Sequence, residues 1–210
     1  MQVSETELRQ AICQWGRSIF ERGLTSGSSG NISARLSDGY LLTPTNSCLG
    51  FLDAARLSKL DRAGNHVSGD KPTKEIPLHL TYYEARPGAG AIVHLHSTYA
   101  TALSCRSDLD PQNVLTPVTP YVVMRVGRVP LLPYSTPGSD QVREPLLKAA
   151  PSHAAVLLAN HGPVVTGASL EAAVFAAEEL EEAARLAFLL EGRPHNVLTE
   201  ANLAELAARF

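Results

Sequence analysis

The sequence predicts an α/β layered domain with a largely antiparallel sheet, and three observations favour this fold class. Stretches with helical hydrophobic spacing are mixed with short strand-like stretches along the chain. Turn residues at 38–39 and 61–64 separate pairs of short apolar runs, as in β-hairpins. The apolar run 154–159 has the length of a buried strand. The 210 residues suit one domain, and we expect residues 1–210 to form it.

The first half of the chain is predicted to hold two helices and two hairpins. A capping-box pattern, Ser4 followed by Glu7, begins the first helix, and Gly23 ends it. The elements that follow are a small, polar loop at 25–31, strands 32–36 and 40–43, two short strands around 61–64, and a helix 75–85.

The second half is predicted to alternate strands with helices around one irregular segment. The elements are a strand 91–95, a helix 97–104, a proline-rich segment 108–136 of loops and short strands, a helix 140–150, strands 154–159 and 164–167, a helix 169–191 and a short helix 200–209. The longest of these helices should place four acidic residues on its solvent face, namely Glu178, Glu179, Glu181 and Glu182.

Composition excludes several classes of function. The formal net charge is −3 and the sequence pI is about 6.2, so there is no basic surplus for binding nucleic acid. The longest apolar runs are too short to span a bilayer, and residues 1–22 are amphipathic and charged, unlike a signal peptide. Cys13, Cys48 and Cys105 match no zinc-finger or disulfide pattern. We therefore expect a cytoplasmic protein with reduced thiols that binds neither nucleic acid nor a membrane.

His94-Leu95-His96 is the first feature that indicates chemistry. Residues i and i+2 of a strand point to the same face, so both imidazoles can ligate one metal ion. The same pattern also occurs as two ordinary, half-buried histidines. A catalytic metal usually takes three protein ligands and leaves one position open, so a third ligand is required.

His161 is the best candidate for that third ligand. It follows the end of an apolar run and precedes a Gly-Pro dipeptide, and polar residues at such rigid breaks commonly build sites. The alternative is a turn histidine without a ligand role. His79 is a weaker candidate, which would share the helix face of Glu75.

Glu75 is the best acid/base candidate. It stands at a predicted helix start, where the macrodipole alone also favours a carboxylate. Thr73 and Lys74 precede it, and a hydroxyl, a cation and free helix N–H groups together favour an anion. Small donors at 28–31 and 43–45 are of the kind that cradle phosphate. No Walker A loop or dinucleotide fingerprint occurs, so neither ATP nor NAD is predicted.

Five motifs, in this order and spacing, resemble the class II aldolase/adducin family. They are Gly30-Asn31-Ile32-Ser33, Thr43-Pro44-Thr45, Lys74-Glu75, His94-Leu95-His96-Ser97 and Asn160-His161-Gly162. The resemblance extends over about residues 5–190. It implies a three-layer α/β/α domain with a largely antiparallel central sheet. It also implies a homotetramer with fourfold symmetry and sites near subunit boundaries.

The resemblance implies roles for single residues as well. The histidines matching His94, His96 and His161 bind a divalent metal in the family, usually Zn²⁺, although Mn²⁺, Co²⁺ and Fe²⁺ also suit such donors. The glutamate matching Glu75 is either a fourth ligand or the acid/base. The residues that match the family's phosphate pocket are Ser28, Asn31, Thr43, Thr73 and Lys74.

Within the family, segments 71–79, 94–104 and 119–127 resemble decarboxylases of 3-oxo-tetronate 4-phosphates. In that likeness Tyr121 corresponds to a proton donor. Lys74 stands where many aldolase members have a serine, and the added cation leaves room for a second anionic group on a phosphorylated sugar-acid substrate. The implied reaction is that of a carbon–carbon lyase, which releases CO₂ and dihydroxyacetone phosphate through an enediolate.

Three alternatives stay open on the sequence alone. The first is an aldolase, epimerase or dehydratase of another phosphosugar, such as fuculose 1-phosphate. The second is a non-catalytic interaction module, because the adducin head has a similar fold without catalysis; the presence of all three histidines argues against it. The third is a metal-binding regulator, which the crowding of phosphate-type donors disfavours.

Overall fold

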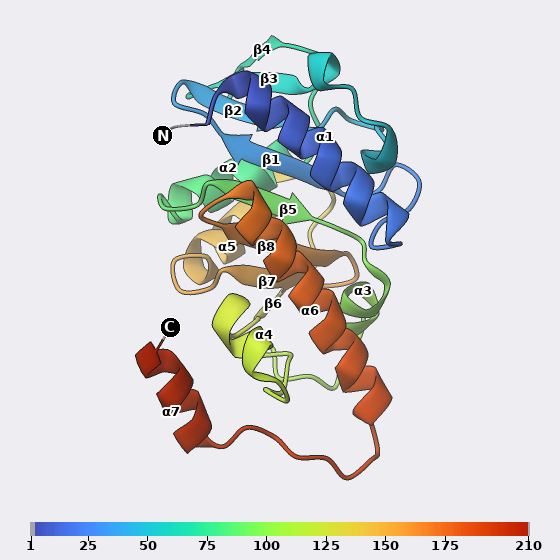
Figure 1. Cartoon of the computed structure of the whole chain (residues 1–210), viewed down its shortest axis with the longest axis vertical. Coiled ribbons are helices and arrows are strands. Elements are labelled where there is room, and N and C mark those ends of the chain that lie inside the picture. Colours follow the sequence, from blue (N-terminus) through green and yellow to red (C-terminus); the bar gives the residue numbers. More distant parts are fainter. Residues whose placement is uncertain (1–2, 210) are drawn as a thin grey trace.

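The computed structural model describes residues 3–209. Eight strands form one sheet in the order β4-β3-β2-β1-β5-β8-β7-β6 (Figure 1). The strands are β1 (Asn31–Arg35), β2 (Gly39–Leu42), β3 (Ser58–Asp61), β4 (His66–Ser68), β5 (Ala91–His94), β6 (Leu131–Leu132), β7 (Ala155–Leu158) and β8 (Gly162–Gly167). Within the described residues, β6 and β7 pair in parallel and the other neighbours are antiparallel, as predicted.

The helices match the predicted positions with one addition. They are α1 (Glu5–Glu21), α2 (Ile76–Ala85), α3 (Thr98–Ser104), α4 (Pro120–Arg125), α5 (Arg143–Ala149), α6 (Leu170–Leu190) and α7 (Glu200–Arg209), with 3₁₀ turns at Leu49–Phe51, Ala54–Arg56 and Asp140–Val142. The predicted capping box begins α1, since the Ser4 and Glu7 side chains each bond to the other residue's backbone N–H. None of the helices in residues 3–209 has both the length and the apolar character needed to cross a membrane.

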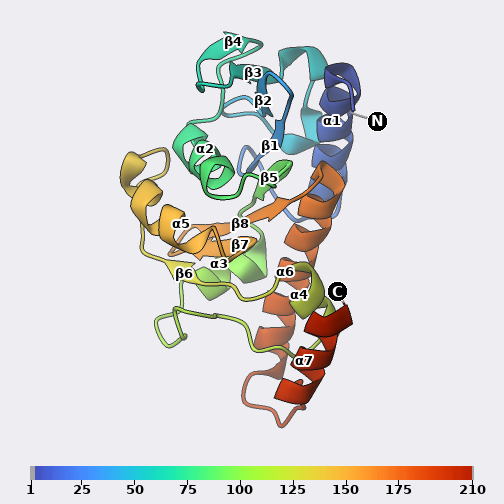
Figure 2. The same ribbon diagram turned by 90° about the vertical axis from the view of Figure 1, so that its left-hand side faces the viewer.

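Helices cover both faces of the sheet, which gives the predicted three layers (Figure 2). Successive residues of a strand point to opposite faces. Val93 and Val165 therefore pack in one apolar cluster with α1, α3 and α6. Ile92 and Val164, their neighbours in sequence, pack in a second cluster with α2 and α5.

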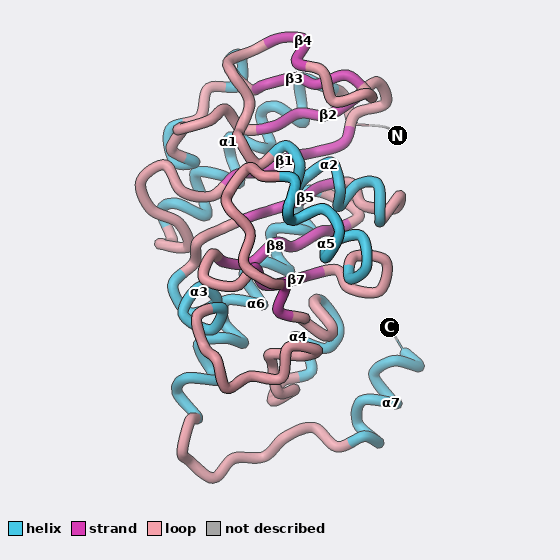
Figure 3. Tube along the Cα trace, turned by 180° about the vertical axis from the view of Figure 1, so that it is seen from behind, coloured by secondary structure: helices cyan, strands magenta, loops and turns pink. Residues whose placement is uncertain are grey.

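The additional helix, α4, lies in the segment that the sequence analysis assigned to loops. Pro120 occupies its first position, where the fixed φ of proline suits a helix and no N–H is needed. Its six residues are too few to give a clear hydrophobic period, and Val122 is its buried residue. An extended connection leads from α6 to α7, which lies beside α4 (Figure 3). Leu198 N donates to Pro117 O at 2.9 Å at the end of that connection.

The strand register brings several predicted site residues to one edge of the sheet. Asn31, the first residue of β1, pairs with His94, the last residue of β5. His94 pairs on its other side with Val164 of β8. The turn between β7 and β8 carries His161 and projects from the same edge. Residues 63 positions apart in sequence thus become neighbours through antiparallel pairing.

Candidate active site

The three histidines singled out in the sequence converge. His94 Nε2 lies 3.3 Å from His161 Nε2 and 3.2 Å from His96 Nε2. The ligand atoms that the three side chains offer all lie within 4.8 Å of one another. β5 ends at His94, and His96 lies two residues beyond it, after Leu95, whose N still donates to Pro163 O at 3.3 Å. The β7–β8 turn brings His161 to meet both side chains.

This arrangement fits a divalent metal. Zn–N bonds of about 2.0–2.1 Å in a tetrahedron put the ligand nitrogens about 3.3–3.4 Å apart, close to the distances seen here. His94 Nδ1 lies 2.8 Å from Pro163 O and donates its proton there, so the lone pair is on Nε2 and faces the centre of the cluster.

The protonation state of the cluster also suits metal binding. Burial, with the neighbouring His161 imidazole, holds the pKa of His94 well below its usual range. Burial lowers the pKa of His96 as well, and it lowers the pKa of His161 to about 4. Neutral imidazoles at pH 7 keep their lone pairs free for a cation.

Backbone geometry in the β7–β8 turn determines where the chain places His161. Asn160 has a φ of 57° and Gly162 a φ of 148°, both in the region that favours glycine or asparagine. A Cβ at Gly162 would lie 2.5 Å from Leu95 O, so only glycine lets the turn pack against the chain between His94 and His96.

Glu75 lies at the start of α2 with its side chain enclosed. It is 5 % exposed, and its Oε1 has no hydrogen-bond partner within residues 3–209. Burial raises the pKa of Glu75, while the Gly138 amide and the Lys74 ammonium act in the opposite direction. An orphaned, buried carboxyl oxygen beside a histidine cluster suits either a cation or a transferable proton.

A cavity of about 210 Å³ joins these groups to the predicted anion-binding side chains. Its wall includes Ser28, Asn31, Thr73, Lys74, Glu75, His94, His96 and His161. Thr73 Oγ1 also accepts from Glu75 N at 3.2 Å, which orders the start of α2. The three histidines and the small polar side chains predicted to bind an anion therefore line one cavity.

Thr43 does not lie in this wall, although the sequence analysis placed it among the phosphate-binding residues. It is fully buried, and its hydroxyl accepts from Ile32 N at 3.1 Å, which ties β2 to β1. Thr45 and Asn46, just beyond it, line the cavity instead. Their position in the Pro44-Thr45-Asn46 turn could have indicated this, because small polar residues that directly follow a strand end often form a site.

Gly30 belongs to the family motif but is not among the predicted site residues. In the structure it lines the cavity. Its φ is 79°, and a Cβ there would lie 3.0 Å from His94 O. Glycine thus permits the loop before β1 to approach β5 closely, which sets the width of the cavity at this point.

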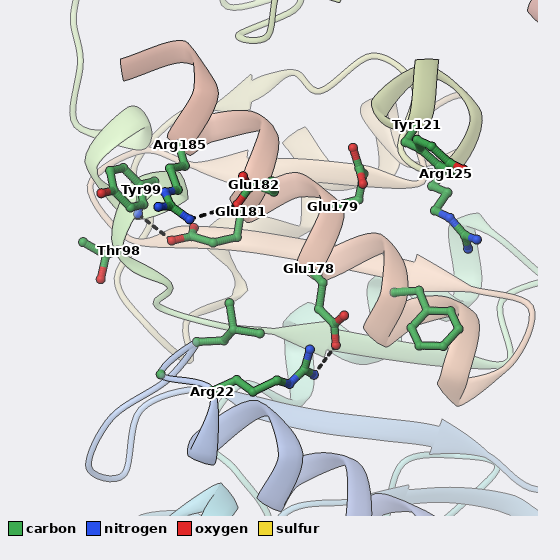
Figure 4. A pocket seen from close by; sticks show the side chains of 13 residues that line it. Arg22, Thr98, Tyr99, Tyr121, Arg125, Glu178, Glu179, Glu181, Glu182 and Arg185 are labelled. Carbon is green, nitrogen blue, oxygen red and sulfur yellow. Dashed lines mark hydrogen bonds and ion pairs between the residues drawn. The ribbon is translucent and has the colours of Figure 1, made fainter. Parts of the chain in front are cut away.

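Tyr121 is not brought to the histidines of its own chain. It lies on α4, is 56 % exposed and lines a separate, larger cavity of about 890 Å³, together with Arg125. Figure 4 shows Tyr121 and Arg125 on α4 across from the acidic residues of α6.

Glu181 corrects the predicted solvent face of α6. It is 9 % exposed, and its carboxylate accepts from Tyr99 N at 2.8 Å (Figure 4) and from Ala100 N at 2.8 Å. These are orphan donors in the first turn of α3, which begins two residues after His96. Glu182 is exposed as expected, whereas Glu178 and Glu179 are half-buried. Helical spacing did not reveal Glu181 because its partners are backbone groups far away in sequence.

Comparison with known proteins agrees with the fold. The family described as "Class II Aldolase and Adducin N-terminal domain" matches residues 10–188. The "3-oxo-tetronate 4-phosphate decarboxylase" of Pectobacterium atrosepticum is 54% identical over 205 residues, covering 97% of this chain and 94% of the relative. The protein of the same name from Haemophilus influenzae is 50% identical and covers 99% of both chains.

Solved structures lead to the same conclusion. The crystal structure of YgbL from Escherichia coli is 50% identical, with a TM-score of 0.94 over 96% of this chain and 98% of that one. An L-fuculose 1-phosphate aldolase is 29% identical, with a TM-score of 0.87 over 100% of this chain and 98% of that one. The chain belongs to the class II aldolase and adducin family.

Proposed function

We propose that this protein is a divalent-metal-dependent carboxy-lyase that converts a 3-oxo-tetronate 4-phosphate into dihydroxyacetone phosphate and CO₂. The observation that carries the proposal is the cavity in which His94, His96 and His161 face Lys74 and Asn31. The relatives that share 50–54% of its residues over nearly the whole chain and are named for this reaction support it.

The substrate's own chemistry defines what the site must do. A 3-oxo acid loses CO₂ when the bond between C1 and C2 breaks and its electron pair moves into a C2–C3 double bond, leaving an enediolate with charge on the C3 oxygen. A proton delivered to C2 then gives dihydroxyacetone phosphate. A divalent cation, when bound, supplies Lewis acidity to the adjacent carbonyl and hydroxyl oxygens.

The residues of the cavity divide this work. His94, His96 and His161 would hold the cation, with Glu75 as a further ligand or as the group that accepts and returns a proton at its free Oε1. The donors Ser28, Asn31 and Thr73 would bind the phosphate, and Lys74 an anionic group of the substrate. We propose Zn²⁺ as the cation because imidazole nitrogens and one carboxylate suit it; Mn²⁺, Co²⁺ and Fe²⁺ are the alternatives. We also propose a cytoplasmic location.

A product assay tests the proposed reaction. Purified protein with one equivalent of Zn²⁺ is supplied with 3-oxo-tetronate 4-phosphates, and CO₂ and dihydroxyacetone phosphate are measured together. Equimolar release of both is the expected result. Fuculose 1-phosphate is the comparison substrate, and faster aldol cleavage of that sugar would identify the protein as an aldolase instead.

We propose a homotetramer with fourfold symmetry, in which Tyr121 of one subunit delivers a proton in the site of its neighbour. The placement of Tyr121 supports this, since it is exposed and lines a cavity other than that of its own histidines. Light scattering should give the mass of four chains. A stable, active monomer would contradict both the assembly and the shared site.

Replacing Tyr121 with phenylalanine should lower decarboxylation at least about tenfold, because an oriented general acid contributes that much or more. An exposed hydroxyl adds little to folding, so metal content and melting temperature should stay native. Mixing Tyr121→Phe with His96→Ala subunits provides the sharper measurement. Random mixing in a ring makes about a quarter of the sites whole if Tyr121 acts across subunits, and none if it acts within its own. The absence of any rescue would reject the shared site.

A further inference from the structure

A series of buried, hydrogen-bonded side chains lies beneath the side of the cavity that carries the proposed anion donors. His79, on α2, is fully buried and contacts two residues of β1. Its Nδ1 lies 2.6 Å from Ser33 Oγ, and its Nε2 lies 2.5 Å from Asn31 Oδ1. Ser33 Oγ is also 2.9 Å from the hydroxyl of Tyr83, which is 2 % exposed. Asn31 is the member of this series that reaches the cavity wall.

The members of this series are held rigidly. The Tyr83 ring stacks on Tyr40 with centroids 4.8 Å apart, and the Arg35 guanidinium lies 4.6 Å from the centroid of the Tyr83 ring. Ser33 sits in the centre of the sheet, where β1 pairs with both β2 and β5. These contacts fix the Tyr83 ring and the Ser33 backbone beside His79.

The direction of hydrogen-bond donation along this series of side chains follows from counting its protons. His79 is fully buried and its ring nitrogens contact only the uncharged Ser33 and Asn31 side chains among residues 3–209, so a neutral ring with a single N–H fits this site. If that N–H is on Nε2, Tyr83 donates to Ser33, Ser33 donates to His79 Nδ1, and His79 donates to Asn31 Oδ1. Every buried donor then has an acceptor.

The opposite direction leaves a donor without a partner. With the proton on Nδ1, His79 would donate to Ser33 and Ser33 to Tyr83. The buried hydroxyl proton of Tyr83 would then have no acceptor, because Ser33 is its hydrogen-bond partner within residues 3–209. An unsatisfied buried donor costs about 1–3 kcal/mol, which favours the first direction.

We propose that His79 is a positioning residue, which as the Nε2–H tautomer fixes the Asn31 amide with its NH₂ group toward the cavity. This inference rests on the proposed function, which assigns a phosphorylated substrate to that space. A phosphate dianion accepts hydrogen bonds and donates none, so an NH₂ group attracts it where an amide oxygen would repel it. Reversing the Asn31 amide would therefore replace the group that binds phosphate with an oxygen that repels it.

Two conservative variants of His79 test this proposal. The amide nitrogen of glutamine can take the position of Nε2, so His79→Gln retains a donor to Asn31 Oδ1. The shorter side chain in His79→Asn retains only the end that faces Ser33. We expect His79→Asn to raise KM for the phosphorylated substrate and the Kd for inorganic phosphate by on the order of tenfold, with kcat changed much less. His79→Gln should stay close to the wild type in both quantities.

Control variants and a direct observation complete the test. Tyr82→Phe removes a buried hydroxyl on the same helix that donates to His153 O at 3.0 Å, outside the chain of bonds described here. It should lower the melting temperature but leave phosphate affinity unchanged. Equal losses of phosphate affinity in His79→Gln, His79→Asn and Tyr82→Phe would reduce His79 to a packing residue and overturn the proposal.

The tautomer is also measurable in the unmodified protein, whether or not the variants fold. Imidazole ¹⁵N chemical shifts should show His79 neutral, with the proton on Nε2. A proton on Nδ1, or a charged ring at pH 7, would overturn the proposal. Binding of inorganic phosphate needs no turnover, so this measurement distinguishes a failure of the proposed reaction from a failure of the proposed role of His79. A protein without decarboxylase activity whose variants behave as expected would contradict only the proposed reaction, and an active enzyme whose His79→Asn variant binds phosphate normally would contradict only the role of His79.

Discussion

Replacing His96 with alanine should remove metal and turnover together. His96 is exposed on the cavity side, whereas His94 is fully buried and bonded to Pro163 O, so His96 is the proposed ligand whose loss disturbs the fold least. The two remaining histidines cannot complete a three-ligand site. We expect metal content near zero and a fall in kcat/KM on the order of 10³-fold, since Lewis-acid stabilisation of the transition state is worth several kcal/mol.

The same variant should fold normally. An exposed substitution changes stability by no more than about 0.5 kcal/mol, which corresponds to about 1–2 °C in the melting temperature of the metal-free protein. Metal is measured by elemental analysis after dialysis, and stability by thermal unfolding in chelator. His66→Ala, at an exposed histidine on β4, is the matched control and should keep both metal and activity. A metal-free His96→Ala protein with native turnover would remove the histidine cluster from the mechanism.

Replacing Glu75 with glutamine should lower turnover on the order of 10²–10⁴-fold, because the amide has the same shape but cannot accept or return a proton. The buried Oε1 has no partner among residues 3–209, and burial has raised the pKa of this carboxyl. Removing a poorly paired buried charge relieves its desolvation cost. The metal-free variant should therefore melt at the same temperature as the wild type or above it, and it should still bind inorganic phosphate.

The measurements are steady-state rates, phosphate titration and thermal unfolding of metal-free protein. Glu84→Gln makes the same substitution on α2, at a surface ion pair with Arg143, and should leave the rate unchanged. A Glu75→Gln protein that is destabilised and inactive to the same degree would assign Glu75 a structural role. Reduced metal affinity beside an intact fold would indicate that Glu75 is a ligand.

The sequence predicts those parts of this protein that depend on local interactions. The capping box at Ser4, the turns at 38–39 and 61–64, and the i, i+2 spacing of His94 and His96 each involve residues close in the chain, so pattern and propensity determine them. The convergence of His161 with this pair was predicted from a weaker signal, a polar break after an apolar run.

The features that the sequence analysis missed depend on partners far away in the chain. Glu181 has the spacing of an exposed residue, yet it binds backbone groups 81 and 82 positions away. Thr43 carries the hydroxyl expected of an anion donor, but it is fully buried against Ile32 N and does not line the cavity. Helical spacing places His79 on the same face as Glu75, but it does not predict that His79 contacts Asn31 and Ser33 of the sheet. Tertiary hydrogen bonds, which no local period encodes, decide all of these cases.

The pairing of Asn31 with His94 fixes the distance between two residues of the proposed site. Neighbouring strands are about 4.8 Å apart, and this spacing separates the backbone of Asn31, a proposed phosphate donor, from that of His94, a proposed metal ligand. A slip of one residue would turn every side chain of the strand to the other face, and a slip of two would move Asn31 by about 7 Å. No small adjustment lies between these values. On the proposed roles, a substrate must therefore place its phosphate and its chelating oxygens to match the fixed span between Asn31 and His94.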